Sequence, residues 1–209
     1  AIFTGHVLLD SAQKYYADVK TQAENAGRNP DHVVVMPGLS PVVGRTESEA
    51  REKQDYLQSL VDPIVAREIL STLLAGVDLS PYPIDGPLPE LKFPENAGQS
   101  TANNWVSLAR RENLTIRQLA LRATHGRGKA AVIGTPEKIA DYMQEWFEKG
   151  GADGFNIQPA YFPGAFVDFV ELVIPELRRR GLVRTEYVGR TLREHFGLPR
   201  PKSRYAREV

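Results

Sequence analysis

The stretch from Ala130 to Gly164, AAVIGTPEKIADYMQEWFEKGGADGFNIQPAYFPG, contains a helix with both ends marked and then a strand. Thr135 can cap the helix, Pro136 suits its first position, and Gly150-Gly151 supplies a left-handed stop. Residues 154–158 alternate apolar and polar side chains, as a strand does. One helix face is predicted to be apolar and is formed by Ile139, Met143, Trp146 and Phe147. A strand so soon after a helix is typical of a parallel α/β sheet, so the stretch predicts a helix–strand unit of a barrel.

The beginning of the chain shows the same alternation of strands and helices. Ile2–Thr4 is predicted to be a short buried strand, and a helix is expected from Asp10 or Ser11 to about Ala26. Residues 32–36 contain a run of three β-branched valines and predict a strand covered on both faces, which Pro37-Gly38 should end. Residues 130–133 form a further short candidate strand.

About a hundred residues separate this part from the capped helix, and they are interpreted as an insertion. Residues 46–74 are predicted to be helical, with a break at Asp62-Pro63 and with Thr46 and Glu49 at capping-box spacing. Residues 78–99 are rich in proline and glycine, so we expect an irregular and mobile loop. Two short helices are expected at 103–112 and 115–122.

The C-terminal part should add one more amphipathic helix and a basic tail. The helix is predicted over 165–180, with Pro175 as a possible kink and an apolar face of Phe166, Phe169, Val170, Val173 and Leu177. Residues 178–209 carry ten basic and three acidic residues, which indicates either an anionic partner or a solvated tail. The predicted organisation is therefore barrel strands and helix at 1–38, insertion at 39–129, barrel helix, last strand and final helix at 130–180, and tail at 181–209.

Composition excludes several functional classes. The 209 residues are 42% hydrophobic and 25% charged, with no cysteine and a formal net charge of zero. Disulfides and thiolate metal sites are excluded, and attraction of the whole molecule to nucleic acid or membrane is not expected. No apolar run is long enough to span a bilayer, the four histidines are too scattered for a metal site, and a cytoplasmic location is expected.

Three segments resemble the bacterial-luciferase-like flavin monooxygenases. They are AIFTGH, HVVVMPGLSPVVGRTESEAREK, and the long run from GTPEKIADYMQEWFEKGG through GFNIQPAYFPG to TLREHFGLPRP. The resemblance spans nearly the whole chain and is strongest to the branch with nitrilotriacetate, dibenzothiophene-sulfone and long-chain alkane monooxygenases. It implies an α/β fold, namely the last three strands of a (β/α)8 TIM barrel with a long insertion. A complete barrel has eight strands and about 250 residues, and the chain opens on a strand without Met, so we expect the earlier strands to precede Ala1.

Candidate site residues follow from the rule that barrel enzymes work at the carboxyl ends of their strands. Phe3 and Thr4 are the candidate flavin contacts, although a Phe in an apolar strand fills the core more often than it contacts a cofactor. Asn156, Gln158 and Tyr161 are the candidate substrate contacts, although the two amides could instead satisfy neighbouring backbone groups.

Two histidines are further candidates. His125 lies where the insertion rejoins the barrel and is the candidate proton donor, with an exposed loop histidine as the alternative. His6, just past the first strand, is open to the same two interpretations. No metal site is predicted.

The resemblance also implies an activity for the complete protein. That protein would take reduced FMN from a separate flavin reductase and insert one oxygen atom into a small organic substrate through a flavin hydroperoxide. The insertion would act as a lid. The alternatives are a deazaflavin-dependent oxidoreductase on the same barrel, and a non-catalytic partial barrel that needs a partner. Because a cut sheet exposes its edges, we expect the missing N-terminal half of the barrel or another copy as that partner, and hence a homo-oligomer or nicked complex.

Overall fold

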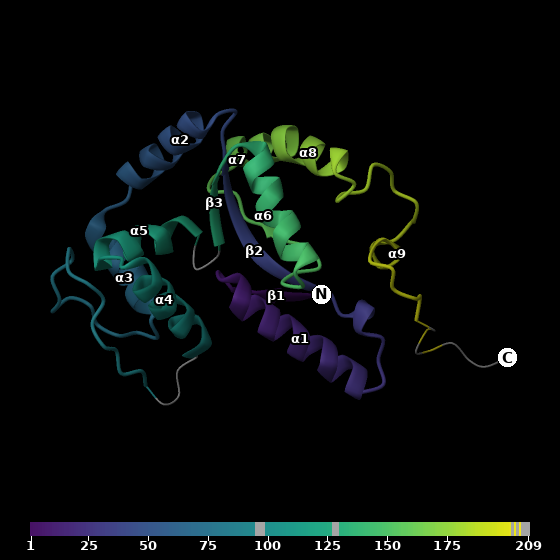
Figure 1. Ribbon diagram of the computed structural model, residues 1–209, viewed down its shortest axis with the longest axis horizontal. Coiled ribbons are helices and arrows are strands. Elements are labelled where there is room, and N and C mark those ends of the chain that lie inside the picture. Colours follow the sequence, from purple (N-terminus) through teal and green to yellow (C-terminus); the bar gives the residue numbers. More distant parts are fainter. Residues whose placement is uncertain (95–98, 127–129, 202, 204, 206–209) are drawn as a thin grey trace.

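The computed structural model describes residues 1–94, 99–126, 130–201, 203 and 205. A parallel sheet lies at its centre, with helix α6 across strand β2 and a group of three helices, α3 to α5, at one side (Figure 1). The C-terminal segment with the short helix α9 (Leu192–His195) extends away from the opposite side (Figure 1). The fold is therefore a sheet with helix α6 packed across it and a separate group of helices, α3 to α5, at one side (Figure 1).

All strands are parallel, and every one pairs with β2 (Val35–Val43). The others are β1 (Ile2–Thr4), β3 (Ala130–Gly134) and β4 (Asn156–Ile157). Leu39 pairs with both Ala130 and Ile157, so β3 and β4 lie on opposite edges of β2. The predicted parallel neighbours at 2–4, 32–36 and 154–158 are confirmed in their arrangement, and the candidate strand at 130–133 is confirmed as β3.

The predicted end of the second strand is wrong. Residues 30–32 form the 3-10 turn η1 (Pro30–His32), and β2 starts later and continues through Pro37-Gly38 to Val43. Val35 and Leu39 direct their carbonyls toward Asp153 and Gln158, so odd positions of β2 face the β4 edge. Pro37 and Pro41 therefore lack their N–H on that edge, just outside the two residues where β4 pairs. The strand also crosses the position-38 boundary at which the insertion is predicted to start.

Helices α1 (Leu9–Asn25) and α6 (Pro136–Glu148) cover one face of the sheet together with a long C-terminal helix. That helix is built from α7 (Gly164–Asp168), the π-helical segment η2 (Phe169–Val173) and α8 (Ile174–Arg179). Thr135 caps α6 by accepting from the Lys138 N–H, and Gly150 has the predicted left-handed conformation. The predicted apolar faces are wrong in part, because three of their residues are exposed: Phe147, Phe166 and Val170.

The insertion forms its own hydrophobic core. It contains α2 (Glu47–Ser59), α3 (Pro63–Leu73), α4 (Gln99–Glu112) and α5 (Ile116–Gly126). The core brings α3, α4 and α5 together and includes Leu70, Leu74, Trp105 and Leu119. Thr46 caps α2 as predicted, and the predicted break at Asp62-Pro63 is confirmed, with Asp62 as the cap of α3. Residues 78–94 contain no helix or strand. Residues 95–98 of the predicted loop lie outside the described part, and its mobility stays a prediction. Among the described residues, no helix has the length and hydrophobicity needed to cross a membrane.

The carboxylate of Asp153 links Tyr16 and Lys20 of α1 to the start of β2. Its Oδ1 accepts a 2.7 Å hydrogen bond from the Tyr16 hydroxyl, and its Oδ2 accepts one of 2.8 Å from the Val35 N–H. Lys20 Nζ lies 2.9 Å from Oδ2 and also donates to two backbone carbonyls of the turn before β2. Three groups from two elements therefore depend on one side chain.

We expect Asp153→Ala to lower the free energy of unfolding by about 2 to 3 kcal/mol, because the Tyr16 hydroxyl and the Val35 N–H lose their acceptor and the Lys20 ammonium loses its anionic partner. Asp85→Ala is the matched control, since Asp85 also pairs with a cation, Arg117, but its side chain is 71% exposed. Its loss should cost less than about 1 kcal/mol. Urea unfolding of both variants measures the difference, and equal costs would contradict the assigned role of Asp153.

Candidate functional site

Two of the predicted site residues share one face of the sheet. Phe3 pairs in register with Met36, and Asn156 pairs with Gly38. Met36 and Gly38 are two residues apart on β2, so they and their partners point to the same face. Phe3 is 65% exposed there. The structure therefore brings an open aromatic ring and a side-chain amide onto one surface, with a glycine of β2 between them.

Thr4 points the other way. It pairs with Pro37, which has the same orientation as Leu39 and its partner Ile157. Ile157 packs against the core beneath α6 and α8, and Thr4 is buried. The side chains of Phe3 and Thr4 therefore lie on opposite faces, so both cannot contact one ligand placed on the Phe3 face.

The end of β4 places the remaining predicted substrate contacts. The Gln158 N–H donates a 2.8 Å hydrogen bond to the Leu39 carbonyl, which extends the pairing of β4 by one residue. Alternation then directs the Gln158 side chain to the same face as Asn156. Tyr161 is 42% exposed and lies against Gly164 at the start of α7. A Cβ added at Gly164 would lie 2.8 Å from the ring of Tyr161.

His6 lies past the end of β1 and contacts α1. Its Nδ1 is 3.2 Å from the Ser11 hydroxyl, and its ring lies 5.0 Å from that of Tyr15. Burial lowers the pKa of His6 because the charged imidazolium loses hydration. A neutral imidazole held by a hydroxyl group is consistent with anchoring the start of α1.

The expectation of a loop at His125 is wrong, because α5 continues to Gly126 and includes this residue. The segment ATHGRGK contains no proline before residue 126, so nothing stops the helix earlier. The side chain of His125 and residues 127–129 lie outside the described part. Its role as a proton donor stays a prediction.

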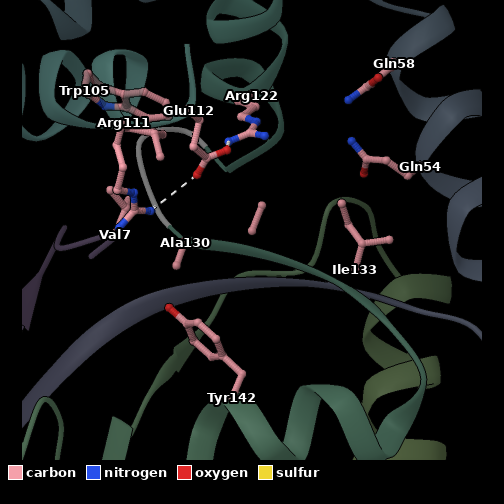
Figure 2. Close-up of a pocket in the computed structure, with 12 residues that line it drawn as sticks. Val7, Gln54, Gln58, Trp105, Arg111, Glu112, Arg122, Ala130, Ile133 and Tyr142 are labelled. Atoms are coloured by element: carbon pink, nitrogen blue, oxygen red, sulfur yellow. Dashed lines mark hydrogen bonds and ion pairs between the residues drawn. The ribbon is translucent and has the colours of Figure 1, made fainter. Parts of the chain in front are cut away.

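A pocket of about 450 Å³ lies between the insertion and the sheet (Figure 2). Helices α2, α4 and α5 form its upper and lateral walls, while β3 and Tyr142 of α6 form its floor. Its polar lining residues are Gln54, Gln58, Arg111, Glu112, Arg122 and Tyr142. No local pattern in the sequence indicates this pocket, because its residues come from four helices, a strand and the loop before α1.

Two arginines at the pocket pair with a single carboxylate. Glu112 is paired with Arg122 and with Arg111, whose Nη2 lies 3.3 Å from its carboxylate. Burial opposes the ionisation of Glu112, but the hydrogen bonds and charges of the two arginines outweigh it and lower its pKa. Burial raises the pKa of Tyr142, so its hydroxyl stays protonated at neutral pH. Within the described part of the chain, no group of three or more His, Asp or Glu side chains is arranged to hold a metal ion.

Parallel strands that each pair with one long strand, helices on the outer face, and polar residues at the carboxyl strand ends define a part of a β/α barrel. The family model of the luciferase-like monooxygenases matches residues 1–154. The chain therefore belongs to the luciferase-like monooxygenase family, which confirms the resemblance seen in the sequence.

Individual relatives agree with this assignment. The chain is 45% identical over 207 residues to N-acetyl-S-(2-succino)cysteine monooxygenase of Bacillus subtilis, covering 99% of this chain and 47% of that protein. It is 36% identical over 207 residues to dibenzothiophene-sulfone monooxygenase of Rhodococcus erythropolis, covering 97% and 45%. The crystal structure of DmoA from Hyphomicrobium sulfonivorans superposes with a TM-score of 0.79 at 26% identity, covering 92% and 40%. The chain thus spans about half the length of the curated relatives it matches.

We expect the unfolding free energy to fall as the pH decreases through the ordinary His pKa of 6.5. The unfolded chain takes up a proton on His6 first, because the folded state holds this pKa lower, and the loss levels off below the folded pKa. Urea unfolding at a series of pH values measures the slope. His6→Gln should remove the part due to His6, and an unchanged slope in that variant would contradict the assignment.

Proposed function

We propose that this chain supplies the C-terminal strands of an FMN-dependent two-component monooxygenase. The observation that carries the proposal is the family match over residues 1–154 together with the open strand-end face that holds Phe3 and Asn156. The complete protein would receive reduced flavin from a separate reductase and would oxidise a small organic substrate. A cytoplasmic location is part of the proposal, supported by the absence of cysteine.

The Phe3 face has groups that fit a flavin ring. Phe3 offers an exposed aromatic surface for stacking, Gly38 has no side chain that would keep a planar ring away from the strand, and Asn156 offers both a donor and an acceptor. Bound flavin would supply the oxygen chemistry. The residues of this chain would orient the ring and exclude water, while Thr4 would support β1 from behind.

The partner follows from the same geometry. An aromatic residue that is 65% exposed on a barrel strand lacks the covering that strands on the remaining part of a barrel provide. The proposed partner is therefore the N-terminal half of the barrel, with a second copy of this chain as the alternative. The substrate stays open, because relatives carry names as different as dibenzothiophene-sulfone and long-chain alkane monooxygenase.

Phe3→Ala in the complete protein is expected to weaken the binding of reduced FMN about tenfold, because it removes one stacking contact. Tyr56→Ala is the control, since Tyr56 is equally exposed at 65% but lies on α2. Anaerobic fluorescence titration measures both. The 209-residue chain alone should not retain stoichiometric FMN, and retention would contradict the need for a partner.

Oxygen uptake separates the classes of function. With a flavin reductase, NADH and FMN, the complete protein should consume oxygen in proportion to the substrate oxidised. Turnover with deazaflavin but not with FMN would favour a reductase on the same barrel. If the complex is folded and both activities are absent, the result would favour a non-catalytic partial barrel.

A further inference from the structure

The pocket between the insertion and the sheet is lined by two polar groups that find no partner, one on α2 and one on α6. The Gln54 side chain is 7% exposed, and neither its Oε1 nor the Tyr142 hydroxyl has a hydrogen-bond partner among the described residues. An unpartnered buried polar group costs about 1 to 3 kcal/mol, and native proteins have few of them. Figure 2 shows Gln54 and Tyr142 reaching toward the pocket from different sides. The pair marks a place where a bound molecule can supply the missing hydrogen bonds.

The rim of the pocket carries one excess positive charge. Arg111 and Arg122 share the single carboxylate of Glu112 (Figure 2). Their side chains are 56% and 43% exposed, so N–H groups not used by Glu112 stay accessible. A guanidinium donates to a carboxylate through two parallel N–H groups, which gives this kind of rim a preference for carboxylates.

The rest of the lining includes apolar side chains. Trp105, which is 2% exposed, lies with Val7 on the side of Arg111, and Ile133 lies on the side of Gln54 (Figure 2). A volume of about 450 Å³ is within the range of small-molecule sites. A ligand for this pocket therefore needs an anionic end, an apolar body and a hydrogen-bonding group at the other end.

We propose that this pocket binds a small organic carboxylate with an aromatic or apolar body, whose carboxylate is held by Arg111 and Arg122 and whose far end hydrogen-bonds with Gln54. The proposal goes beyond the proposed function, because it needs no flavin and is tested without turnover.

The probe is 4-hydroxyphenylacetate, which carries a carboxylate, an aromatic ring and a hydroxyl group in that order. Its uncharged isostere 4-hydroxyphenylacetamide tests the contact with the arginines, and phenylacetate tests the contact with Gln54. Titrations of the complete protein, which includes the N-terminal half of the barrel, are followed by ¹H–¹⁵N NMR at the Trp105 indole N–H and the Gln54 amide.

We expect saturable shifts at Trp105 and Gln54 with 4-hydroxyphenylacetate, and at least about tenfold weaker binding of the amide, as for the loss of one charge-assisted pair. The absence of saturable binding, equal affinity for the amide, or shifts that spare both Trp105 and Gln54 would each overturn the proposal. These comparisons use the unmodified chain, so they do not depend on the folding of a variant.

Variants then assign the two ends of the site. Arg111→Gln should weaken the binding of 4-hydroxyphenylacetate about tenfold, whereas Arg110→Gln, an exposed neighbour on α4 that does not line the pocket, should not. Gln54→Leu should remove the advantage of 4-hydroxyphenylacetate over phenylacetate without lowering the unfolding free energy, because it removes an unpartnered amide. Equal losses in both arginine variants, or an unchanged preference in Gln54→Leu, would contradict the proposed contacts.

Discussion

The backbone pairing of β2 is the constraint on which the rest of the structure depends, because β1, β3 and β4 each pair with it. Ile2 donates to the carbonyl of Val34, an even position, whereas β4 uses the odd positions. Since β3 lies opposite β4, β1 and β3 follow one another along the same edge of β2. The nine residues of β2 thus pair with β1 at their start and with β3, the strand that follows the insertion, toward their end. At Gly44 the chain turns so closely that an added Cβ would lie 2.3 Å from the Ala50 nitrogen, which fixes α2 against the end of β2.

Much of the fold could be predicted from the sequence, because local signals and tertiary structure agree at most elements. Thr135, Pro136 and Gly150 mark α6, and the alternation at 154–158 marks β4. The prediction failed at Pro37-Gly38, where a proline is tolerated because it comes just before the residues of β2 that pair with β4, so its missing N–H falls outside that pairing. Sequence alone does not show which strand edge is free.

The C-terminal helix shows a second limit. Its buried residues, Ala165, Phe169, Val173 and Leu177, are spaced by four, whereas the sequence predicts an apolar face with a 3.6-residue period. The π-helical segment η2 takes more residues per turn than an α-helix, so a spacing of four stays on one face through it, and Phe166 and Val170 turn outward.

The prediction of the candidate site from the sequence was incomplete for a similar reason. Phe3 and Asn156 follow from the rule of strand ends, but the meeting of Gln54, Trp105 and Tyr142 depends on packing between distant segments.

The separate core of the insertion has a consequence for how the chain folds. The core of α3, α4 and α5 is assembled from residues that are mostly within about sixty positions of one another, whereas the sheet must join residue 2 to residue 35 and residue 39 to residue 157. Closing the longer loops costs more chain entropy before any contact is gained. The helical cluster therefore forms a local cooperative unit that can assemble before the sheet does, and its amides should exchange with solvent independently of those in β2.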